Sequence, residues 1–274
     1  MLKDVTLGQY FPGNSVVHKL DPRTKLLMVI LYFVALFSAK GLAGYLVIFA
    51  FLAASIAISG IPFKSITRGL KPLVIIVAFT GVLNLFYADG THIIFQIGKV
   101  KATWEGAATA GFMIARIIML ITGTFLLTYT TSPIALTDGL ESLLGPLKKI
   151  KVPVHELAMM MCIALRFIPT LIEETDKIIC AQKARGADFE SGNILQRAKA
   201  LVPILVPLFI SAFRRADELA IAMESRCYQG GKGRTKLKQL KFATRDYWTL
   251  LLGACLIALV VVLKKLGIGP GLGL

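Results

Sequence analysis

The sequence has few residues of the types that bind metal ions or carry out covalent catalysis. Its 274 residues include four cysteines and three histidines, and these are scattered along the chain. No CxxC pair occurs, and no histidine stands at a spacing typical of zinc sites. The sequence therefore predicts no metal centre, no Ser-His-Asp triad and no cofactor.

Acidic residues are also scarce, with 16 Asp and Glu against 31 Lys and Arg and a net charge of +15. A basic excess can indicate nucleic-acid binding, but the chain carries no motif of a nucleic-acid-binding fold. The same excess arises when Lys and Arg flank membrane spans on the cytoplasmic side. We therefore expect the lipid bilayer, and no nucleic acid, as a partner.

A phosphate-binding loop is missing as well. The stretch GGKGRT, residues 230–235, resembles one superficially. A true phosphate-binding loop reads GxxxxGK[ST] and lies between a strand and a helix. Here the upstream glycine and the preceding strand are both absent from the pattern. Residues suited to an intramembrane enzyme, such as paired acids or a Ser-Lys pair within spans, are not found either, so we predict a non-catalytic chain.

Long hydrophobic runs are abundant. Hydrophobic residues make up 55% of the chain, and its mean hydropathy is +0.70, which exceeds that of ordinary soluble domains. Several runs approach the ~20 residues that cross a bilayer as a helix. The five predicted spans are residues 26–39, 42–60, 73–88, about 106–129, and 247–263. The fold class predicted is an all-α integral membrane protein with about five transmembrane helices.

The loop charges predict the orientation. Lys and Arg gather in the N-terminal segment, in the loop after the second span, and in the region after the fourth span. The positive-inside rule places all three in the cytoplasm, which leaves the C-terminus outside. Lys264 and Lys265 count mildly against this arrangement. The first 25 residues are polar, so we expect no cleavable signal peptide.

Arg116 stands near the middle of the fourth predicted span. A charge at that depth costs at least ~2.5 kcal/mol. One interpretation is a buried contact to another helix or to a partner subunit. The other is that the helix begins later than predicted, which leaves Arg116 near an interface.

Residues 132–245 differ from the spans around them. They predict a short helix from Pro133, then two long helices, from Pro153 to Arg185 and from Asn193 to about Arg226. Each long helix joins an apolar part, too short or too interrupted to span, to a mixed and amphipathic part. The predicted domains are 1–131 (N-terminal membrane domain), 132–245 (cytoplasmic region), and 246–274 (final span and tail).

The two long helices end in the same way, with an arginine beside small or turn-forming residues. These residues are Ala184, Arg185, Gly186, Ser225, Arg226 and Cys227. A single such arginine is explained by the helix dipole, which favours a cation in the last turn. Two matching ends on long helices favour a second role, because a guanidinium offers a fork of donors to a partner's carboxylates and carbonyls. We therefore expect both ends to insert into partner proteins.

Nearly the whole chain resembles the EcfT family, the transmembrane coupling components of energy-coupling-factor (ECF) transporters. Four stretches carry the resemblance: GQYFPGNSVVHKLDPRTKL (8–26), VPVHELAMMMCIALRFIPTLIEE (152–174), AQKARGADF (181–189) and LVPLFISAFRRADELAIAMESRCY (205–228). In this family two long coupling helices each end in an Ala-Arg-Gly-type motif that docks into a groove on an ATPase. The first motif is intact here, whereas Ser225, Arg226 and Cys227 depart from the second, and the lost glycine leaves the tightness of that turn and its cap open.

The resemblance implies the partners and the role. They are two ATP-binding subunits (EcfA and EcfA′) and a membrane-embedded substrate-binding S component, in a bacterial plasma membrane. The implied fold adds long amphipathic cytoplasmic coupling helices to the spans. The implied function is to transmit ATP-driven movement to the S component for vitamin or micronutrient uptake. The alternative is a stand-alone channel or secondary carrier, which would transport without ATPases.

Overall fold

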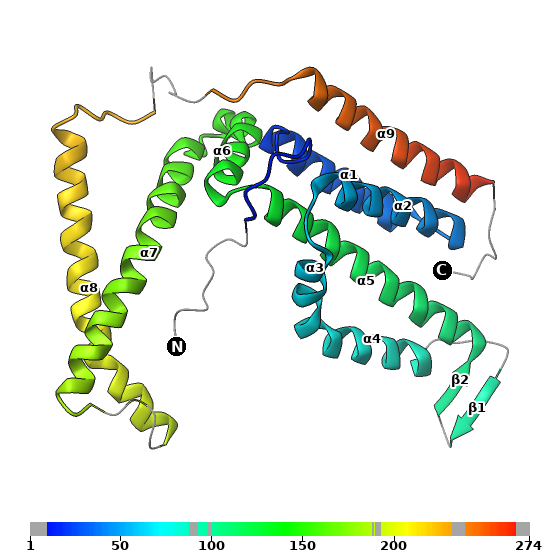
Figure 1. Cartoon of the computed structure of the whole chain (residues 1–274), viewed down its shortest axis with the longest axis horizontal. Helices are drawn as coiled ribbons and strands as arrows, with labels where there is room; N and C mark the ends of the chain where they lie inside the picture. The colour runs from blue at the N-terminus through cyan, green and yellow to red at the C-terminus, as the bar shows by residue number, and fades with distance from the viewer. Residues whose placement is uncertain are drawn as a thin grey trace. The chain divides into compact units, whose positions relative to one another are not determined.

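The computed structural model describes residues 10–87, 93–97, 100–187, 189, 193–231 and 239–266, which belong to two compact units (Figure 1). One unit comprises Gly8–Gly139 and Leu240–Leu274, and we call it the membrane unit. The other comprises Met1–Leu7 and Leu140–Gln239, and we call it the long-helix unit. Each is described by itself.

The described part of the membrane unit is mainly helical. Its helices are α1 (Pro22–Ser38), α2 (Leu42–Ser59), α3 (Phe63–Leu70), the 3₁₀ turn η1 (Lys71–Leu73), α4 (Val74–Tyr87), α5 (Trp104–Thr130) and α9 (Thr244–Lys265). Helix α6 (Pro133–Leu143) begins in this unit and ends in the next. Helix α5 packs against α1, α2, α3 and α4, and α9 packs against α1 and α2. The unit is therefore organised around α5 and α1.

Five helices in the described residues are long and apolar enough to cross a membrane. They are Leu42–Ser59, Phe63–Leu85, Gly106–Thr130, Val154–Ala184 and Thr244–Lys265. Four of these correspond to predicted spans, and an all-α integral membrane protein is confirmed. The first predicted span forms α1, whose 17 residues extend only about 25 Å. The remaining qualifying helix is Val154–Ala184. The expectation that this segment is too short or too interrupted to span is therefore wrong, because its length and composition are sufficient.

Local sequence explains where the first helix begins. The carboxylate of Asp21 accepts the backbone N–H of Arg23 at 2.9 Å, and Pro22 occupies the first helical position. A side-chain acceptor at the N-cap satisfies a donor that the helix leaves unpaired, and proline fits there because its missing N–H is not needed. These two neighbouring residues therefore set the N-terminus of α1.

The core of the membrane unit joins α1, α2, α5 and α9. Leu36, Ile48 and Val260 are fully buried within it. Tyr32 is buried as well, and its hydroxyl donates a hydrogen bond to the carbonyl oxygen of Met119 at 3.1 Å. A buried hydroxyl needs such a partner, since an unpaired polar group in an apolar core is costly. This bond holds α1 against the middle of α5.

A β-hairpin interrupts the helices between α4 and α5. Strands β1 (Ile93–Ile97) and β2 (Val100–Thr103) pair antiparallel, with Ile97 opposite Val100. The predicted spans leave residues 89–105 without a predicted element, so this pairing is an addition to the all-α prediction. Thr103 then caps α5, because its hydroxyl accepts the N–H of Gly106 at 3.1 Å.

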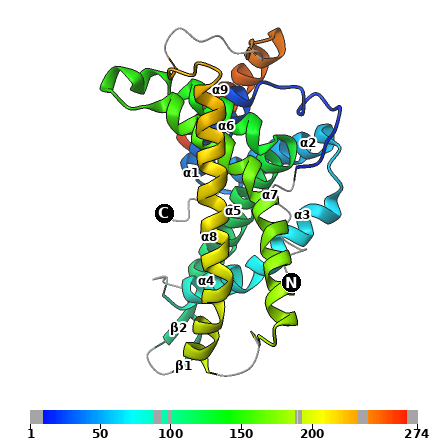
Figure 2. The same cartoon turned by 90° about the vertical axis from the view of Figure 1, so that its left-hand side faces the viewer.

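The long-helix unit is built on two 31-residue helices, α7 (Val154–Ala184) and α8 (Ile194–Glu224), which follow the 3₁₀ turn η2 (Gly145–Ile150). Prolines lie inside both helices, and both helices continue through them. The two helices run antiparallel, because contacts move back along α8 as they move forward along α7: Glu174 meets Arg215, and Gln182 meets Pro203. Figures 1 and 2 show their C-terminal ends pointing in opposite directions.

One contact between α7 and α8 follows directly from a proline. Pro207 has no N–H, so the carbonyl of Pro203, four residues earlier, loses its usual helical partner. The side-chain amide of Gln182 donates to that carbonyl oxygen at 3.3 Å. A helix interruption in α8 is thus satisfied from α7, which ties the last turn of α7 to the first half of α8.

Candidate functional site

The end of α7 is a Schellman turn centred on Arg185. Arg185 is the C-cap, and Gly186 follows it with φ of +86°. The N–H of Gly186 donates to the carbonyl of Lys183 at 3.0 Å, and the N–H of Ala187 donates to that of Gln182 at 3.0 Å. These two bonds satisfy carbonyls that a helix end leaves unpaired. Glycine suits this turn because it has no Cβ to oppose a positive φ.

The end of α8 has the same turn, centred on Arg226. The N–H of Cys227 donates to the carbonyl of Glu224 at 2.8 Å, and the N–H of Tyr228 donates to that of Met223 at 3.1 Å. Cys227 occupies the place of Gly186 and adopts φ of +58°. The lost glycine therefore does not change the type of turn, which answers the question that the sequence left open.

A cysteine in this conformation is strained, because the left-handed region brings Cβ too close to a backbone oxygen. The cost is roughly 1–2 kcal/mol for a residue other than glycine. The two hydrogen bonds of the turn, together with the helix before it, hold Cys227 there nonetheless.

All six predicted site residues, Ala184, Arg185, Gly186, Ser225, Arg226 and Cys227, are exposed. The structure does not bring the two triplets together. Because α7 and α8 are antiparallel, the triplets lie at opposite ends of the helix pair, and α8 alone is about 46 Å long if straight. Such a spacing suits two separate binding partners rather than one joint site.

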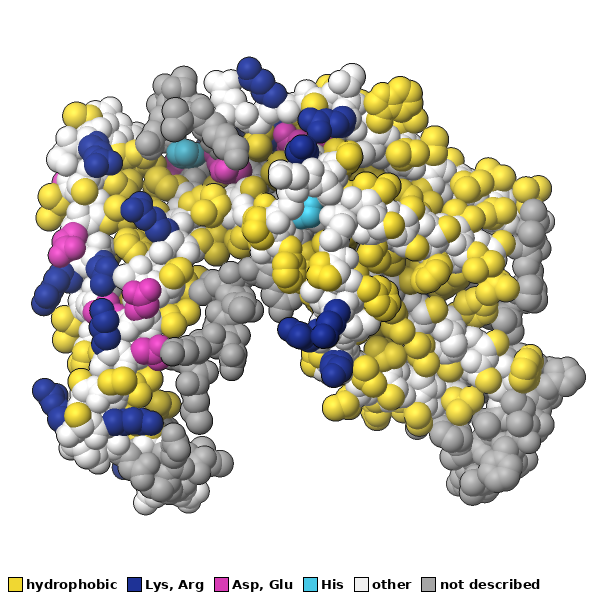
Figure 3. Space-filling model, viewed as in Figure 1, with side chains coloured by type: hydrophobic (Ala, Val, Ile, Leu, Met, Phe, Trp, Pro, Cys, Tyr) yellow, Lys and Arg dark blue, Asp and Glu magenta, His cyan; other side chains and the backbone are white. Residues whose placement is uncertain are grey.

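The chemistry available at each end is that of a guanidinium beside a compact turn. Each arginine lies at the negative end of its helix dipole, which contributes about 0.3–1 kcal/mol to helix stability. The guanidinium can form paired hydrogen bonds to carboxylates or carbonyls. The small side chains on either side of each arginine allow another protein surface to approach closely. Figure 3 shows Lys, Arg, Asp and Glu side chains gathered over the long helices.

A buried polar cluster at one end of the membrane unit was not predicted from the sequence. Asp246 is 2% exposed, and its two carboxylate oxygens accept the N–H groups of Asp21 at 2.9 Å and Ala243 at 2.7 Å. The ammonium of Lys25 donates to the carbonyl of Thr130 at 2.8 Å. The cluster therefore joins the start of α1, the end of α5 and the start of α9. An acid in the first turn of a span, in a chain short of acids, was the signal that could have identified it.

This cluster bears on the membrane topology. The three helix ends that it joins are those that the positive-inside rule places in the cytoplasm. Three ends held together by hydrogen bonds must lie on the same side of a bilayer. Which side that is stays a prediction from the charges.

Arg116 is the thirteenth residue of α5, so the helix does not begin late and the second interpretation of this residue is wrong. Its Nε donates to the hydroxyl of Tyr45 in α2 at 2.8 Å, and its guanidinium lies over the rings of Phe37 and Tyr45, at 5.8 Å from each centroid. The contact to another helix is thus confirmed. A partner subunit at Arg116 stays untested.

The remaining candidate in the sequence, GGKGRT, lies mostly outside the described residues, which include only Gly230 and Gly231 of this stretch.

Comparison with known proteins gives the family. The family model described as cobalt transport protein, CbiQ, matches residues 13–237. The "Energy-coupling factor transporter transmembrane protein EcfT" of Thermosediminibacter oceani is 60% identical over 245 residues, which cover 89% of this chain and 92% of that protein. The protein of the same name in Bacillus subtilis is 49% identical over 265 residues, which cover 96% of this chain and all of that protein. With matches of this length and the fold described above, the chain belongs to the CbiQ/EcfT family of membrane transport components.

Proposed function

We propose that this chain is the transmembrane coupling subunit of an ECF-type importer. It receives ATP-driven movement from two ATP-binding subunits and passes it to a membrane-embedded S component that binds a vitamin or other micronutrient. The chain itself is not catalytic, because ATP is bound and hydrolysed on the partner chains. The coupling region is residues 132–245, held on the cytoplasmic side of a bacterial plasma membrane.

One observation carries this proposal: α7 and α8 end in the same Schellman turn, each with an exposed arginine directly before the residue of positive φ. Cys227 adopts a strained left-handed conformation to make that turn. Helix dipoles favour arginine at these positions but do not require two identical turns. Two similar receptors, one on each ATP-binding subunit, would require them.

The transmission of movement follows from the connection between the helices. When ATP draws the two ATP-binding subunits together, their grooves carry the ends at Arg185 and Arg226 with them. Because α7 and α8 are joined by polar contacts of Glu174 with Arg215 and of Gln182 with Pro203, movement at the ends changes the angle between the helices. Large apolar side chains are exposed along both helices, including Met160 on α7 and Phe209 and Phe213 on α8. These offer an apolar surface on which the S component can rest.

The experiment that tests this function reverses both charges. In the double variant Arg185→Glu and Arg226→Glu, we expect neither ATP-binding subunit to co-purify with the chain, and ATP-dependent uptake to be lost. The matched control is Arg214→Glu, an exposed arginine within α8 that lies away from the turn. Membrane insertion should be normal in both variants. A double variant that still retains both subunits would refute the docking role, and uptake without ATP-binding subunits would favour a stand-alone carrier.

A further inference from the structure

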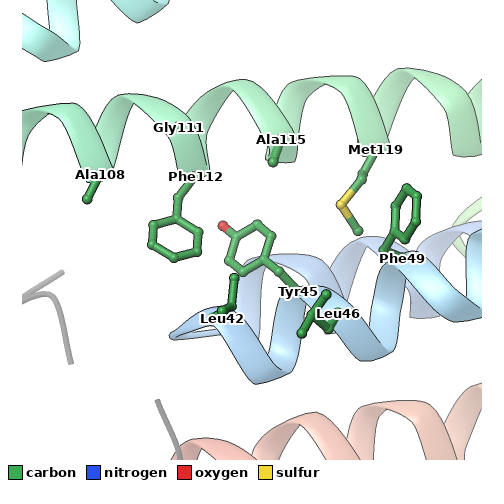
Figure 4. Close-up of a pocket in the computed structure, with 9 residues that line it drawn as sticks. All are labelled: Leu42, Tyr45, Leu46, Phe49, Ala108, Gly111, Phe112, Ala115 and Met119. Atoms are coloured by element: carbon green, nitrogen blue, oxygen red, sulfur yellow. The ribbon is translucent and has the colours of Figure 1, made fainter. Parts of the chain in front are cut away.

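An apolar groove lies in the membrane unit between α2 and α5. It has a volume of about 360 Å³, and its lining residues, drawn in Figure 4, include Leu46, Phe49, Gly111 and Met119. Leu46 and Phe49 are more than half exposed, at 58% and 59%. Both helices belong to predicted spans, so the groove is open toward the hydrocarbon of the bilayer. Its surface suits an acyl chain.

A second, smaller pocket adjoins this groove and is positively charged. It has a volume of about 190 Å³, and its lining includes Lys40 and Arg116. Tyr45 and Phe112 line both pockets, with ring centroids 5.1 Å apart, so the two spaces share a wall. Neither lining contains an acidic residue. The charged pocket suits an anion placed at the end of an apolar chain.

The environment of Arg116 supports an anionic ligand. In the part of the chain that the structure describes, no carboxylate pairs with this guanidinium. Its neighbours are the hydroxyl of Tyr45, the sulfur of Met113 at 4.0 Å and two aromatic rings. These orient the group without neutralising it, and a charge within a span costs at least ~2.5 kcal/mol. A bound phosphate would offset that cost through charge-assisted hydrogen bonds.

We propose that this composite pocket binds one anionic phospholipid, with its headgroup phosphate at Arg116 and an acyl chain along the groove between α2 and α5. A guanidinium in a pocket without acidic residues can bind a phosphate through charge-assisted hydrogen bonds. A partner helix fits less well, because a helix is about 10 Å wide, whereas the groove has the volume of a small-ligand site.

The test is a lipid titration of the purified full-length chain in detergent, followed by native mass spectrometry. The probes are dioleoylphosphatidylglycerol, which is anionic, and dioleoylphosphatidylcholine, which has the same chains and no net charge. Two variants separate the two halves of the site. Arg116→Gln removes the charge, and Gly111→Leu fills the groove at a position where an added Cβ meets nothing within 4 Å.

We expect the wild-type chain to prefer phosphatidylglycerol. Arg116→Gln should weaken its binding roughly fivefold and remove the preference over phosphatidylcholine. Gly111→Leu should weaken the binding of both lipids. Because this substitution does not alter the core, the proposal can still be tested if Arg116→Gln folds poorly. The matched controls are Arg68→Gln, an exposed arginine on α3, and Ala254→Leu, an exposed position on α9. Both should bind lipid as the wild type does.

Three results would overturn the proposal. The first is equal binding of the two lipids by the wild-type chain. The second is wild-type binding of phosphatidylglycerol by both Arg116→Gln and Gly111→Leu, or an equal loss in Arg68→Gln. The third is unchanged lipid binding with a loss of S-component co-purification in those two variants, which would assign the groove to a protein helix instead.

Discussion

The side-chain amide of Gln182 in α7 donates a hydrogen bond to the carbonyl oxygen of Pro203 in α8, at 3.3 Å. The carbonyl of Gln182 itself accepts the N–H groups of Arg185 and Ala187 in the turn that ends α7. Gln182 therefore connects the first arginine turn to the neighbouring helix. We expect movement of that turn to reach α8 through this residue.

This relationship gives the first prediction. Replacing Gln182 with Met keeps the bulk of the side chain but removes the donor, so the carbonyl of Pro203 loses its partner. We expect a loss of stability of about 0.5–1.5 kcal/mol, toward the low end because the bond is exposed. Pro207→Ala restores an N–H within α8 and should make the stability independent of Gln182. Thermal unfolding of the four variants of this cycle measures the coupling, and additive effects would contradict it.

The second prediction concerns the strained cysteine. Cys227→Gly removes the strain of a positive φ and should stabilise the end of α8 by about 1 kcal/mol. Gly186→Ala introduces the same strain and should destabilise the end of α7 by a similar amount. An added Cβ at Gly186 meets nothing within 4 Å, so the second change tests backbone strain alone. Hydrogen exchange of the last turn of each helix reports both effects. Faster exchange in Cys227→Gly would show that the cysteine is not strained.

The third prediction concerns the polar contact between α7 and α8 at Glu174. Glu174 accepts a hydrogen bond from the hydroxyl of Ser211 and pairs with Arg215 at 3.0 Å. Both charged side chains are partly exposed, so we expect a coupling energy of about 0.2–1 kcal/mol in a double-mutant cycle. Disrupting the pair should lower the transport rate clearly while it changes the free energy of unfolding only slightly. The reason is that we expect the pair to hold the angle between the two helices. The neighbouring exposed residues Glu173 and Arg214 are the controls, and an equal effect there would exclude a special role for the pair.

The fourth prediction concerns the buried carboxylate of the membrane unit. Asp246→Ala leaves the N–H groups of Asp21 and Ala243 without an acceptor. The cost is roughly 1–3 kcal/mol for the buried N–H of Asp21 and less for the half-buried N–H of Ala243. Asp246→Asn keeps one acceptor oxygen and should lose less. Thermal unfolding in detergent ranks the variants, with the exposed Asp217→Ala as control. If Asp246→Ala unfolds at the wild-type temperature, these hydrogen bonds do not hold the starts of α1 and α9 together.

Much of the fold could be predicted from the sequence because its signals are local. Apolar runs located four of the five qualifying spans, and the end of α7 could be read from Gly186, because glycine is the usual residue at a left-handed helix end. The conformation of the turn at Cys227 could not be predicted from its residue type, since cysteine does not prefer a positive φ. The hydrogen bonds that the carbonyls of Met223 and Glu224 accept determine this conformation.

The features that sequence reasoning missed depend on contacts between distant residues. Nothing in the run around Pro207 indicates that Gln182, more than twenty positions earlier, satisfies the carbonyl that this proline leaves free. The acceptors of Lys25 are backbone carbonyls, which every residue has, so the pattern could not identify them. The depth of Arg116 was ambiguous for a similar reason, because its partner Tyr45 lies in another helix.

We propose that Arg185 and Arg226 each lie in a groove of an ATP-binding subunit, and site-specific crosslinking can detect these contacts. A photo-reactive residue is placed at 185, at 226 or, as a control, at the exposed position 173, and each chain is irradiated in the assembled transporter in membranes. We predict adducts between positions 185 and 226 and the ATP-binding subunits, and none at 173. Adducts only with lipid or with the S component at 185 and 226 would contradict the account.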